Sequence, residues 1–349
     1  MFQASYTRYL LNFHRPAGTS RGVLRKKECW FLKLVREDGV TGIGEVSFIP
    51  GLSMEDPDEI EIQVDHICKL ISRGEMHPSQ AFPSLPGIQF ALETALMDIW
   101  HGGRRILFPS DFTEGHTGIP TNGLIWMGDR SYLVEQIREK IKRGFRVLKM
   151  KVGAIELETE LEVLAWIQSE YGSGELEIRL DANGAWSPEN APGRLTAFAR
   201  YGIHSVEQPI APGQAETMAG LCTDPIIPIA LDEELIGVVR TEDRSKLLEM
   251  IRPSYIILKP GLLGGFSVAN EWIQFASQLG TEWWVTSALE SSVGLNAIAQ
   301  WTYDLAVSLP QGLGTGQLYT NNIPSPLQMS GEQLWYRPGN KWDLNSIGL

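Results

Sequence analysis

The stretch "RVLKMKVG" at residues 146–153 combines the pattern of a buried strand with two lysines. Side chains on a strand point to alternate faces, so Lys149 and Lys151 share one face and Met150 points to the other. Two ammonium groups this close repel each other, and burying either one is costly without partners. We therefore expect negatively charged groups around the end of this strand.

Short apolar strands alternate with amphipathic helices from about residue 119 onward. Residues 121–128 are typical of a strand and residues 131–144 of a helix that ends at a glycine, and the lysine stretch is the next strand. This alternation is typical of βα units around a parallel sheet. Further strands are expected in "LEIRLDANG", "IHSVEQPI", "IPIALDEEL", "SYIILKPG", "EWWVTSALESS" and, as a weaker last strand, "SLPQGLGTGQLY". Eight such strands favour an α/β fold with a closed TIM-type barrel over an open sheet.

The first 118 residues have a different pattern. Residues 29–48 indicate a β-hairpin that turns at Asp38-Gly39. Helices are expected at 58–74 and 88–103. Strands followed by helices predict a separate α+β domain.

The C-terminal residues 327–345 return to short strands with turn residues between them. We predict that they pack back on the first domain. The expected organisation is a first domain at 1–118, a barrel at 119–320 and a tail at 321–349.

Composition limits the partners and the compartment. The formal net charge of −12 argues against nucleic acid or an anionic membrane as partner. The three cysteines are far apart and form no CxxC pair, which favours unpaired thiols in a reducing compartment. The N-terminus lacks the pattern of a signal peptide, and no apolar run of about 20 residues is present to span a bilayer. We predict a cytoplasmic protein, and the sequence leaves the oligomeric state open.

Acidic residues recur near the ends of three successive predicted strands. Asp181, Glu207 and Asp232 are separated by 26 and 25 residues, each about one βα unit. Lys151 precedes this series by 30 residues and Lys259 follows it by 27. In a parallel barrel the C-terminal strand ends form the mouth, where active sites lie. Each carboxylate alone could be a solvated loop residue, but five ionisable residues in phase on consecutive strands indicate a site.

Three oxygen donors without a nearby His or Cys suit a hard cation such as Mg²⁺. Three carboxylates and one divalent ion leave a charge of −1, which one ammonium group offsets. A second lysine is then driven toward its neutral form by its neighbour and by burial. Lowering a lysine pKa from ~10.4 to ~7–8 yields a general base at working pH. The chemistry that fits is proton abstraction α to a carboxylate, with Mg²⁺ stabilising the enediolate.

The motifs "KMK", "DAN", "EQP", "LDEE" and "KPGLLGG", in this order and spacing, resemble the muconate-lactonizing enzyme subgroup of the enolase superfamily. The resemblance covers nearly the whole chain. It implies a modified TIM barrel, (β/α)7β, and an N-terminal α+β capping domain completed by the C-terminal tail.

Four more specific segments resemble the o-succinylbenzoate synthase family. They are "RPAGTSRGVL" (15–24), "NGLIWMG" (122–128), "SALESSVGLNAIAQW" (287–301) and "PQGLGTGQLYTNN" (310–322). The resemblance implies a Mg-dependent lyase of menaquinone biosynthesis. Its reaction would be the syn-dehydration of 2-succinyl-6-hydroxy-2,4-cyclohexadiene-1-carboxylate, a small-molecule carboxylate, to 2-succinylbenzoate.

The resemblance also implies a role for each charged residue. Lys151 would remove the proton α to the ring carboxylate and then assist departure of the hydroxyl group from the same face. Lys149 would lower the pKa of Lys151, and Lys259 would stabilise the enediolate from the opposite side of the ring. The metal, Mg²⁺ or alternatively Mn²⁺, would be bound by Asp181, Glu207 and Asp232.

Neighbours of the carboxylates are further candidates. Arg179, Asp181 and Asn183 alternate with apolar residues, so all three are expected to face the barrel interior. Arg179 and Asn183 would orient the ligands or touch substrate, and a structural hydrogen-bonding role is the alternative. Glu233 is expected behind Asp232, outside the direct ligands.

Ser291 and Ser292 follow the seventh predicted strand, and Gly314 lies near the eighth. The two serines or backbone amides near Gly314 would hold a substrate carboxylate, with a plain turn as the competing interpretation. The resemblance implies that two loops, 14–22 and 48–56, close over the mouth as lids, with an ordinary surface loop as the competing interpretation.

Arg15 and Arg21 lie in the first of these loops. Both are candidate anion contacts.

Two other functions remain open at this stage. An N-succinylamino acid racemase or dipeptide epimerase of the same subgroup would use Lys151 and Lys259 on opposite faces of its substrate, and this sequence has both. A non-catalytic anion-binding scaffold is the third hypothesis. It is disfavoured because a protein freed from catalysis has no reason to keep like charges buried together.

Overall fold

The computed structural model describes residues 1–19, 22–172 and 174–348. Its N-terminal part is an antiparallel sheet of β1 (Phe2–Thr19), β2 (Gly22–Arg36) and β3 (Thr41–Ser47). The predicted hairpin between β2 and β3 is confirmed, and Gly39 adopts a φ of +84° in its turn, a conformation that glycine tolerates. The long strand β1 was not predicted.

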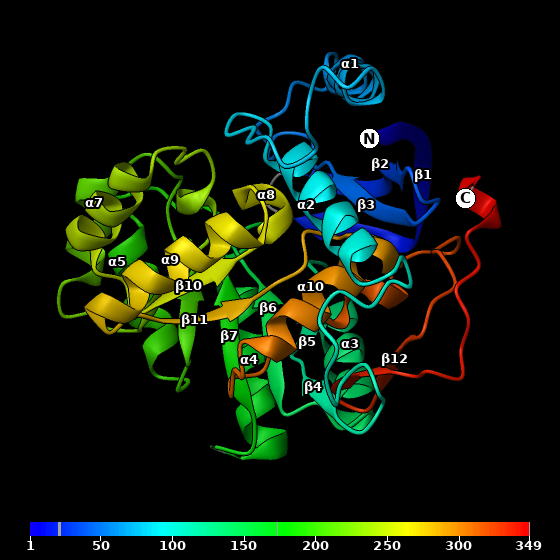
Figure 1. The fold of residues 1–349 in the computed structure, drawn as a ribbon. Helices are drawn as coiled ribbons and strands as arrows, with labels where there is room; N and C mark the ends of the chain where they lie inside the picture. The colour runs from blue at the N-terminus through cyan, green and yellow to red at the C-terminus, as the bar shows by residue number, and fades with distance from the viewer. Residues whose placement is uncertain (20–21, 173, 349) are drawn as a thin grey trace.

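Two helices cover this sheet, α1 (Ile60–Ser72) and α2 (Pro86–Trp100). Their ends agree with the predicted ranges to within three residues. Figure 1 shows α2 lying across β2 and β3. The contact between α2 and β3 is so close that a Cβ atom added to Gly44 would lie 1.9 Å from the carbonyl oxygen of Ala91. Glycine at this position therefore lets the helix lie directly on the strand.

The predicted barrel is confirmed. Adjacent parallel strands follow one another in chain order: β5 (Gly123–Ile125), β6 (Val147–Lys151), β7 (Glu177–Asp181), β8 (Ser205–Glu207), β9 (Ile229–Leu231), β10 (Tyr255–Leu258) and β11 (Glu282–Val285). The weaker eighth strand is reduced to parallel bridges, in which Gln311 pairs with Thr121 and Gly312 pairs with Thr286. These bridges connect the two edges of the sheet.

Helices lie outside the strands (Figure 1). They are α3 (Arg130–Lys142), α4 (Leu157–Tyr171), α5 (Ala191–Ala199), α6 (Ala215–Cys222), α7 (Thr241–Ile251), α8 (Pro260–Leu263), α9 (Phe266–Leu279) and α10 (Ser292–Asp304). Short 3-10 turns occur at η1 (Glu233–Leu235), η2 (Gly314–Gln317) and η3 (Asn345–Ile347). Apolar side chains of the strands and helices form one large core, which fixes the strand ends in space.

The C-terminal tail contacts both parts of the molecule. Its strand β12 (Leu327–Ser330) pairs with β13 (Gln333–Tyr336), and β13 pairs with β4 (Gly118–Pro120), just before the barrel begins. Ile347 of η3 belongs to a hydrophobic cluster with Leu11 and Phe13 of β1. The tail thus packs on the N-terminal sheet, as expected for this fold class. The domain boundaries at residues 118 and 320 stay predictions.

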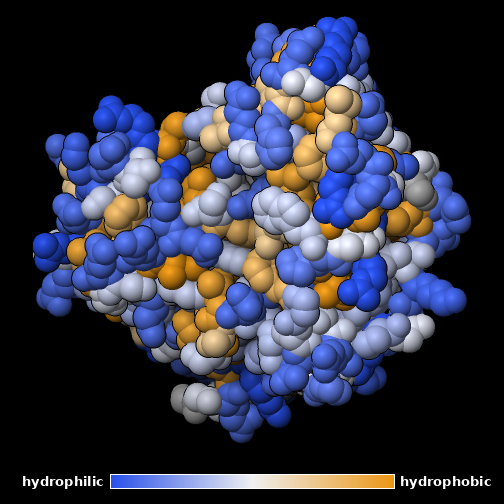
Figure 2. Space-filling view, viewed as in Figure 1, coloured by the Kyte–Doolittle hydropathy of each residue, from blue (hydrophilic) through white to orange (hydrophobic). Residues whose placement is uncertain are grey.

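The surface in Figure 2 is mainly hydrophilic, with hydrophobic patches dispersed among charged side chains. Within residues 1–19, 22–172 and 174–348, no helix has the length and apolar character needed to cross a bilayer.

Candidate active site

The parallel register brings the predicted charged residues to one level at the barrel mouth. Lys151 at the end of β6 pairs with Asp181 of β7, which in turn pairs with Glu207 of β8. Asp232 directly follows β9, and Lys259 directly follows β10. Five successive strands therefore present one ionisable side chain each at their C-terminal ends, as predicted.

These side chains form two groups of ion pairs. Lys149 Nζ lies 2.8 Å from Asp181 Oδ2 and 2.6 Å from Glu207 Oε2. Lys151 Nζ lies 2.6 Å from the same Asp181 oxygen. The second group is the pair of Asp232 and Lys259, in which Asp232 Oδ2 accepts a hydrogen bond from Lys259 Nζ.

The three lysines differ in their proton affinity. Burial lowers the pKa of Lys151, and the positive charges of Lys149 and Lys259 lower it further against the opposing effect of Asp181. Burial also acts on Lys149, but its contacts with Asp181 and other carboxylates outweigh burial and raise its pKa. The pKa of Lys259 is raised in the same way, mainly by Asp232. Of the three, Lys151 is the lysine disposed to act as a neutral base.

The carboxylates suit a divalent cation. Asp181, Glu207 and Asp232 are at most 2% exposed and offer only oxygen donors, which are the ligands that Mg²⁺ prefers. Burial raises the pKa of Glu207 well above its usual value, and the negative charges of Asp181 and Asp232 add to this effect. A further positive charge at this position would keep Glu207 ionised, so the donor set fits a Mg²⁺ ion.

Asn183 forms a hydrogen bond with Lys151, and Glu233 forms one with Asn183. Asn183 Oδ1 accepts a hydrogen bond of 2.8 Å from Lys151 Nζ, and its Nδ2 donates to Glu233 Oε1 at 3.0 Å. Asn183 has a φ of +47°, a left-handed conformation in which asparagine is enriched among residues other than glycine. The structure thus places Asn183 in contact with Lys151, and Glu233 in contact with Asn183.

Gln208 was not assigned a role from the sequence, although it lies in the quoted motif "EQP". Its Oε1 accepts hydrogen bonds from the backbone N–H groups of Asp232 and Glu234, both at 3.1 Å. Its Nε2 donates to Glu234 Oε2 at 3.1 Å. Gln208 therefore holds the turn that carries Asp232. The signal for this role was an amide next to Glu207, a predicted metal ligand, in the same motif.

A cavity of about 250 Å³ opens at the charged group. Lys149, Lys151, Asn183 and Lys259 line one side of it. The other side is neutral and is formed by the strand ends of β5, β11 and the eighth segment: Asn122, Leu124, Trp126, Thr286, Ser287, Ala288, Leu289, Gly312, Gly314 and Thr315. The mouth is therefore divided into a charged half and a neutral half.

The N-terminal domain closes the cavity with two segments. Leu24 comes from β2, and Ile49, Pro50 and Leu52 come from the second predicted lid loop. Arg15 is exposed and lies 3.7 Å from Glu135 on the surface. Arg21 lies outside the described residues.

Arg179 shares the inward face of β7 with Asp181 but makes its contacts away from the cavity. Its Nε donates to Glu177 at 2.8 Å, its Nη1 donates to the Pro310 carbonyl at 2.9 Å, and its guanidinium lies 4.3 Å from the centre of the Trp284 ring. This geometry matches the structural alternative that the sequence left open for Arg179.

The predicted serines also lie apart from the residues that line the cavity in the described structure. Ser291 is the N-cap of α10, and its hydroxyl donates to Glu45. The backbone N–H of Ser292 donates to Asn322 Oδ1 at 2.9 Å. Gly314 does line the cavity. The wall comes from residues 286–289 instead, because these connect β11 to the helix and so pass over the mouth.

Three polar atoms of the neutral half were missed from the sequence. Asn122 Oδ1, Thr286 Oγ1 and Thr315 Oγ1 are buried and have no hydrogen-bond partner among the described residues. Asn122 and Thr286 stand next to β5 and β11, so the strand-end rule that found the carboxylates could have found them.

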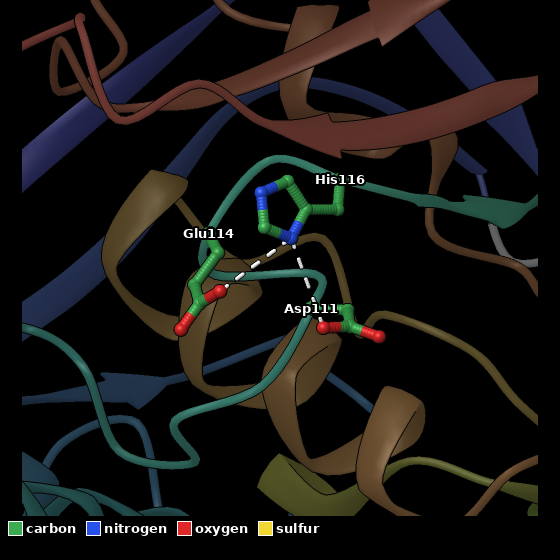
Figure 3. A group of neighbouring side chains, drawn as sticks. All are labelled: Asp111, Glu114 and His116. Carbon is green, nitrogen blue, oxygen red and sulfur yellow. Dashed lines mark ion pairs between the residues drawn. The ribbon is translucent and has the colours of Figure 1, made fainter.

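A second group of metal-ligand side chains lies on the surface (Figure 3). Atoms of Asp111, Glu114 and His116 lie within 4.8 Å of one another, and all three residues are exposed. His116 Nδ1 is 3.4 Å from Glu114 and 3.7 Å from Asp111. This group has no connection to the cavity.

The (β/α)7β-type barrel, the capping sheet and the carboxylates flanked by lysines define an enzyme-type scaffold of the enolase superfamily. A family model described as "Enolase C-terminal domain-like" matches residues 132–322. The chain is 46% identical to the o-succinylbenzoate synthase of Desulfotalea psychrophila (strain LSv54 / DSM 12343), over 94% of this chain and 97% of that protein. It therefore belongs to the o-succinylbenzoate synthase family.

Solved structures agree with this assignment. The crystal structure of MenC from Desulfotalea psychrophila LSv54 matches with a TM-score of 0.84 and 43% identity, covering 96% of this chain and 99% of that one. The L-Ala-D/L-Glu epimerase of Bacillus subtilis matches with a TM-score of 0.83 but only 20% identity, covering 98% and 97%. The second likeness concerns the fold alone.

Proposed function

We propose that this protein is an o-succinylbenzoate synthase, a lyase that removes water from 2-succinyl-6-hydroxy-2,4-cyclohexadiene-1-carboxylate to give 2-succinylbenzoate for menaquinone synthesis. The observation that carries the proposal is the state of Lys151. It faces the cavity and contacts Asp181 and Asn183, and burial together with neighbouring cations lowers its pKa. The 46% identity to a synthase over nearly the whole chain supports the choice of substrate.

Lys151 would carry both proton transfers. Its neutral Nζ takes the proton from the carbon α to the ring carboxylate, and the electron pair moves into the carboxylate to form an enediolate. The resulting ammonium group then gives the proton to the departing hydroxyl on the same face, so water leaves and Lys151 returns to its neutral form. Asn183 holds Nζ in place during both steps.

The charged neighbours would stabilise the negative charge that develops. Asp181, Glu207 and Asp232 would hold Mg²⁺ or Mn²⁺, which supplies positive charge next to the substrate carboxylate when bound. Lys149 stays protonated and keeps the pKa of Lys151 low. Lys259 would lie on the other face of the ring. There its ammonium group would stabilise the ring, as the ring becomes aromatic, through a cation–π contact.

The neutral half of the cavity would take the succinyl group. Asn122, Thr286 and Thr315 offer polar atoms that have no partner among the described residues. Buried polar groups are normally satisfied by hydrogen bonds, so a ligand that supplies them is favoured. The hydroxyl groups of Thr286 and Thr315 would donate hydrogen bonds to the distal carboxylate of the substrate, and Leu24 and Ile49 would pack on its methylene carbons. Asn122 Oδ1 only accepts hydrogen bonds, so the carboxylate would not satisfy it.

We place the reaction in the cytoplasm. Cys29, Cys68 and Cys222 are free thiols in the described structure, as expected of a reducing compartment.

The alternative that retains support is racemisation of N-succinylamino acids or epimerisation of dipeptides. Lys151 and Lys259 both line the cavity, from β6 and from the turn after β10, as two opposed acid–base groups would. Their retention is compatible with either activity. The identity to a synthase favours dehydration.

The test is turnover of freshly prepared substrate, followed by its ultraviolet change with Mg²⁺ and with chelator. Metal-dependent turnover that disappears in Lys151→Ala would support the synthase. No turnover by a folded protein would refute it. Exchange of the α-proton of N-succinylamino acids in D₂O, followed by NMR, would then identify the racemase.

A further inference from the structure

The cavity wall at residues 286–289 is attached to the capping domain by a buried hydrogen-bond chain. The Ala288 carbonyl oxygen accepts a hydrogen bond of 3.2 Å from Ser47 Oγ. Ser47 Oγ in turn accepts a hydrogen bond of 2.7 Å from Lys27 Nζ. Lys27 is 3% exposed and Ser47 is 1% exposed, although the charge of Lys27 takes no part in the proposed chemistry.

Lys27 fixes the direction of this chain. An ammonium group can only donate, so Ser47 Oγ must act as the acceptor toward Lys27. The hydroxyl has one proton, and that proton is then directed to the Ala288 carbonyl. Lys27 thereby holds the Ser47 hydroxyl in the orientation that donates a hydrogen bond to the wall at Ala288.

The next residue of the wall is strained. Leu289 has a φ of +61°, which is rare for a bulky side chain. Its carbonyl oxygen accepts a hydrogen bond of 2.6 Å from the Tyr319 hydroxyl. Such a conformation persists when its surroundings determine it, and strained residues cluster at ligand sites. Ala288 and Leu289 both line the cavity, so the strain lies where a ligand would bind.

The start of α10, directly after the wall, is attached to the same strand. Glu45 is fully buried and accepts hydrogen bonds from the backbone N–H groups of Ser291, at 2.9 Å, and Gly294, at 2.8 Å. Glu45 and Ser47 are two residues apart on β3, so both point from one face of the capping sheet toward the barrel. Strand β3 therefore contacts the wall at Ala288 and also the start of the helix that follows the wall.

We propose that Lys27 and Ser47 are positioning residues of the capping domain that set the shape of the cavity wall at 286–289 and thereby the affinity for the succinyl group. This inference rests on the proposed function. The two residues act through Ala288 and not on the reacting atoms. Because the wall belongs to the neutral half of the mouth, losing its anchor affects binding of the substrate tail and leaves proton transfer by Lys151 nearly unchanged.

The experiment compares Ser47→Ala and Lys27→Met with the unmodified protein. Two stable ligands serve as probes: 2-succinylbenzoate, and 2-acetylbenzoate, which has the same ring carboxylate and ketone but lacks the distal carboxylate. We expect the Kd for 2-succinylbenzoate to rise at least fivefold in both variants while the Kd for 2-acetylbenzoate changes less than twofold. KM should rise while kcat stays within about threefold, and hydrogen exchange should accelerate at the amides of 286–289.

Asp98→Asn is the matched control. Asp98 is a fully buried capping-domain residue that pairs with Arg105 at 2.7 Å and accepts a hydrogen bond from the backbone of β3 at Ile43. The Asp98→Asn variant should have a lower Tm but the same ratio of the Kd for 2-succinylbenzoate to the Kd for 2-acetylbenzoate. If Ser47→Ala and Lys27→Met also lower Tm and leave that ratio and the exchange at 286–289 unchanged, the chain is a structural contact and the proposal is wrong.

Failure of the proposed function gives a different result. In that case the unmodified protein neither turns over the substrate nor binds 2-succinylbenzoate. Ser47→Ala removes a single oxygen atom, so it remains informative if Lys27→Met fails to fold.

Discussion

Lys149 and Lys151 place their ammonium nitrogens around one atom, Oδ2 of Asp181, at 2.8 and 2.6 Å. The two lysines are not equivalent, because Lys149 also contacts Glu207 whereas the second contact of Lys151 is the neutral amide of Asn183. The proton that this group gives up most readily is therefore on Lys151. Two lysines that share Asp181 Oδ2 thus differ in character: Lys149 stays a cation, and Lys151 is a candidate base.

Replacing Lys151 by alanine should abolish dehydration. General acid–base catalysis by a positioned group contributes about 10²–10⁴-fold, and here one side chain would serve both steps. We expect kcat to fall by about 10³-fold or more, measured by the ultraviolet change of the substrate. Lys142→Ala removes an exposed lysine of α3 and should leave kcat unchanged. A Lys151→Ala variant that keeps more than a tenth of the activity would exclude Lys151 as the base.

Removal of divalent metal should abolish activity, and Mg²⁺ should restore it. Asp232→Asn is expected to weaken Mg²⁺ binding by at least tenfold, because it removes one of three charged donors and leaves Lys259 without its ion-pair partner. Isothermal titration with Mg²⁺ measures this affinity. The surface group provides the control: the double variant Asp111→Asn with Glu114→Gln should bind Mg²⁺ at the active site normally. Loss of activity in that control would instead assign the metal to the surface group.

The position of the site along the chain could be predicted because strand-end spacing is a property of the sequence. One βα unit separates each charged residue from the next, and the parallel register then brings Lys151, Asp181 and Glu207 side by side. The hairpin turn at Asp38-Gly39 was found for a similar reason, since a local dipeptide determines it. Local and periodic signals therefore account for the barrel and its charged half.

The direction in which a long side chain turns could not be predicted in the same way. Lys149 and Arg179 are register partners on β6 and β7, so both lie at the same level of the barrel. Lys149 lines the cavity, whereas Arg179 turns to the Trp284 ring and the Pro310 carbonyl. Contacts between distant segments, such as Ser291 with Glu45, depend on how the capping sheet is placed on the barrel, and no local pattern encodes that.

Glu160 should make stability depend on pH. It is 1% exposed on α4, and its Oε1 accepts a hydrogen bond of 2.6 Å from the Gly153 backbone. Burial raises the pKa of Glu160 from 4.5 to about 7, against the opposing effects of Gly153 and Arg194. The folded protein binds this proton more tightly than the unfolded chain. The contribution of Glu160 to stability is therefore fully present below pH 4.5 and is lost as the pH rises through about 7.

Glu160→Gln keeps an acceptor for Gly153 but does not titrate. The free energy of unfolding of the variant, relative to that of the unmodified protein, should increase by on the order of 2 kcal/mol as the pH is raised from 5 to 8. Urea unfolding at several pH values measures this difference. Glu162→Gln, at an exposed position of the same helix, should show no such trend. A constant difference between Glu160→Gln and the unmodified protein across this pH range would contradict the raised pKa.

Gly44→Ala should loosen the capping domain. The added Cβ atom would lie 1.9 Å from the Ala91 carbonyl oxygen, so α2 would have to move away from β3. Overpacking of this kind costs about 1–3 kcal/mol or more. The same strand carries Ser47, which contacts the cavity wall, and Glu45, which contacts the start of α10. Gly220→Ala is the matched substitution: Gly220 lies within α6 with no atom within 4 Å of an added Cβ. Gly220→Ala should raise the free energy of unfolding by about 0.5 kcal/mol, because alanine has the higher helix propensity. Urea unfolding of both variants measures the contrast, and a Gly44→Ala protein as stable as the unmodified one would show that the helix does not need glycine to lie on the strand.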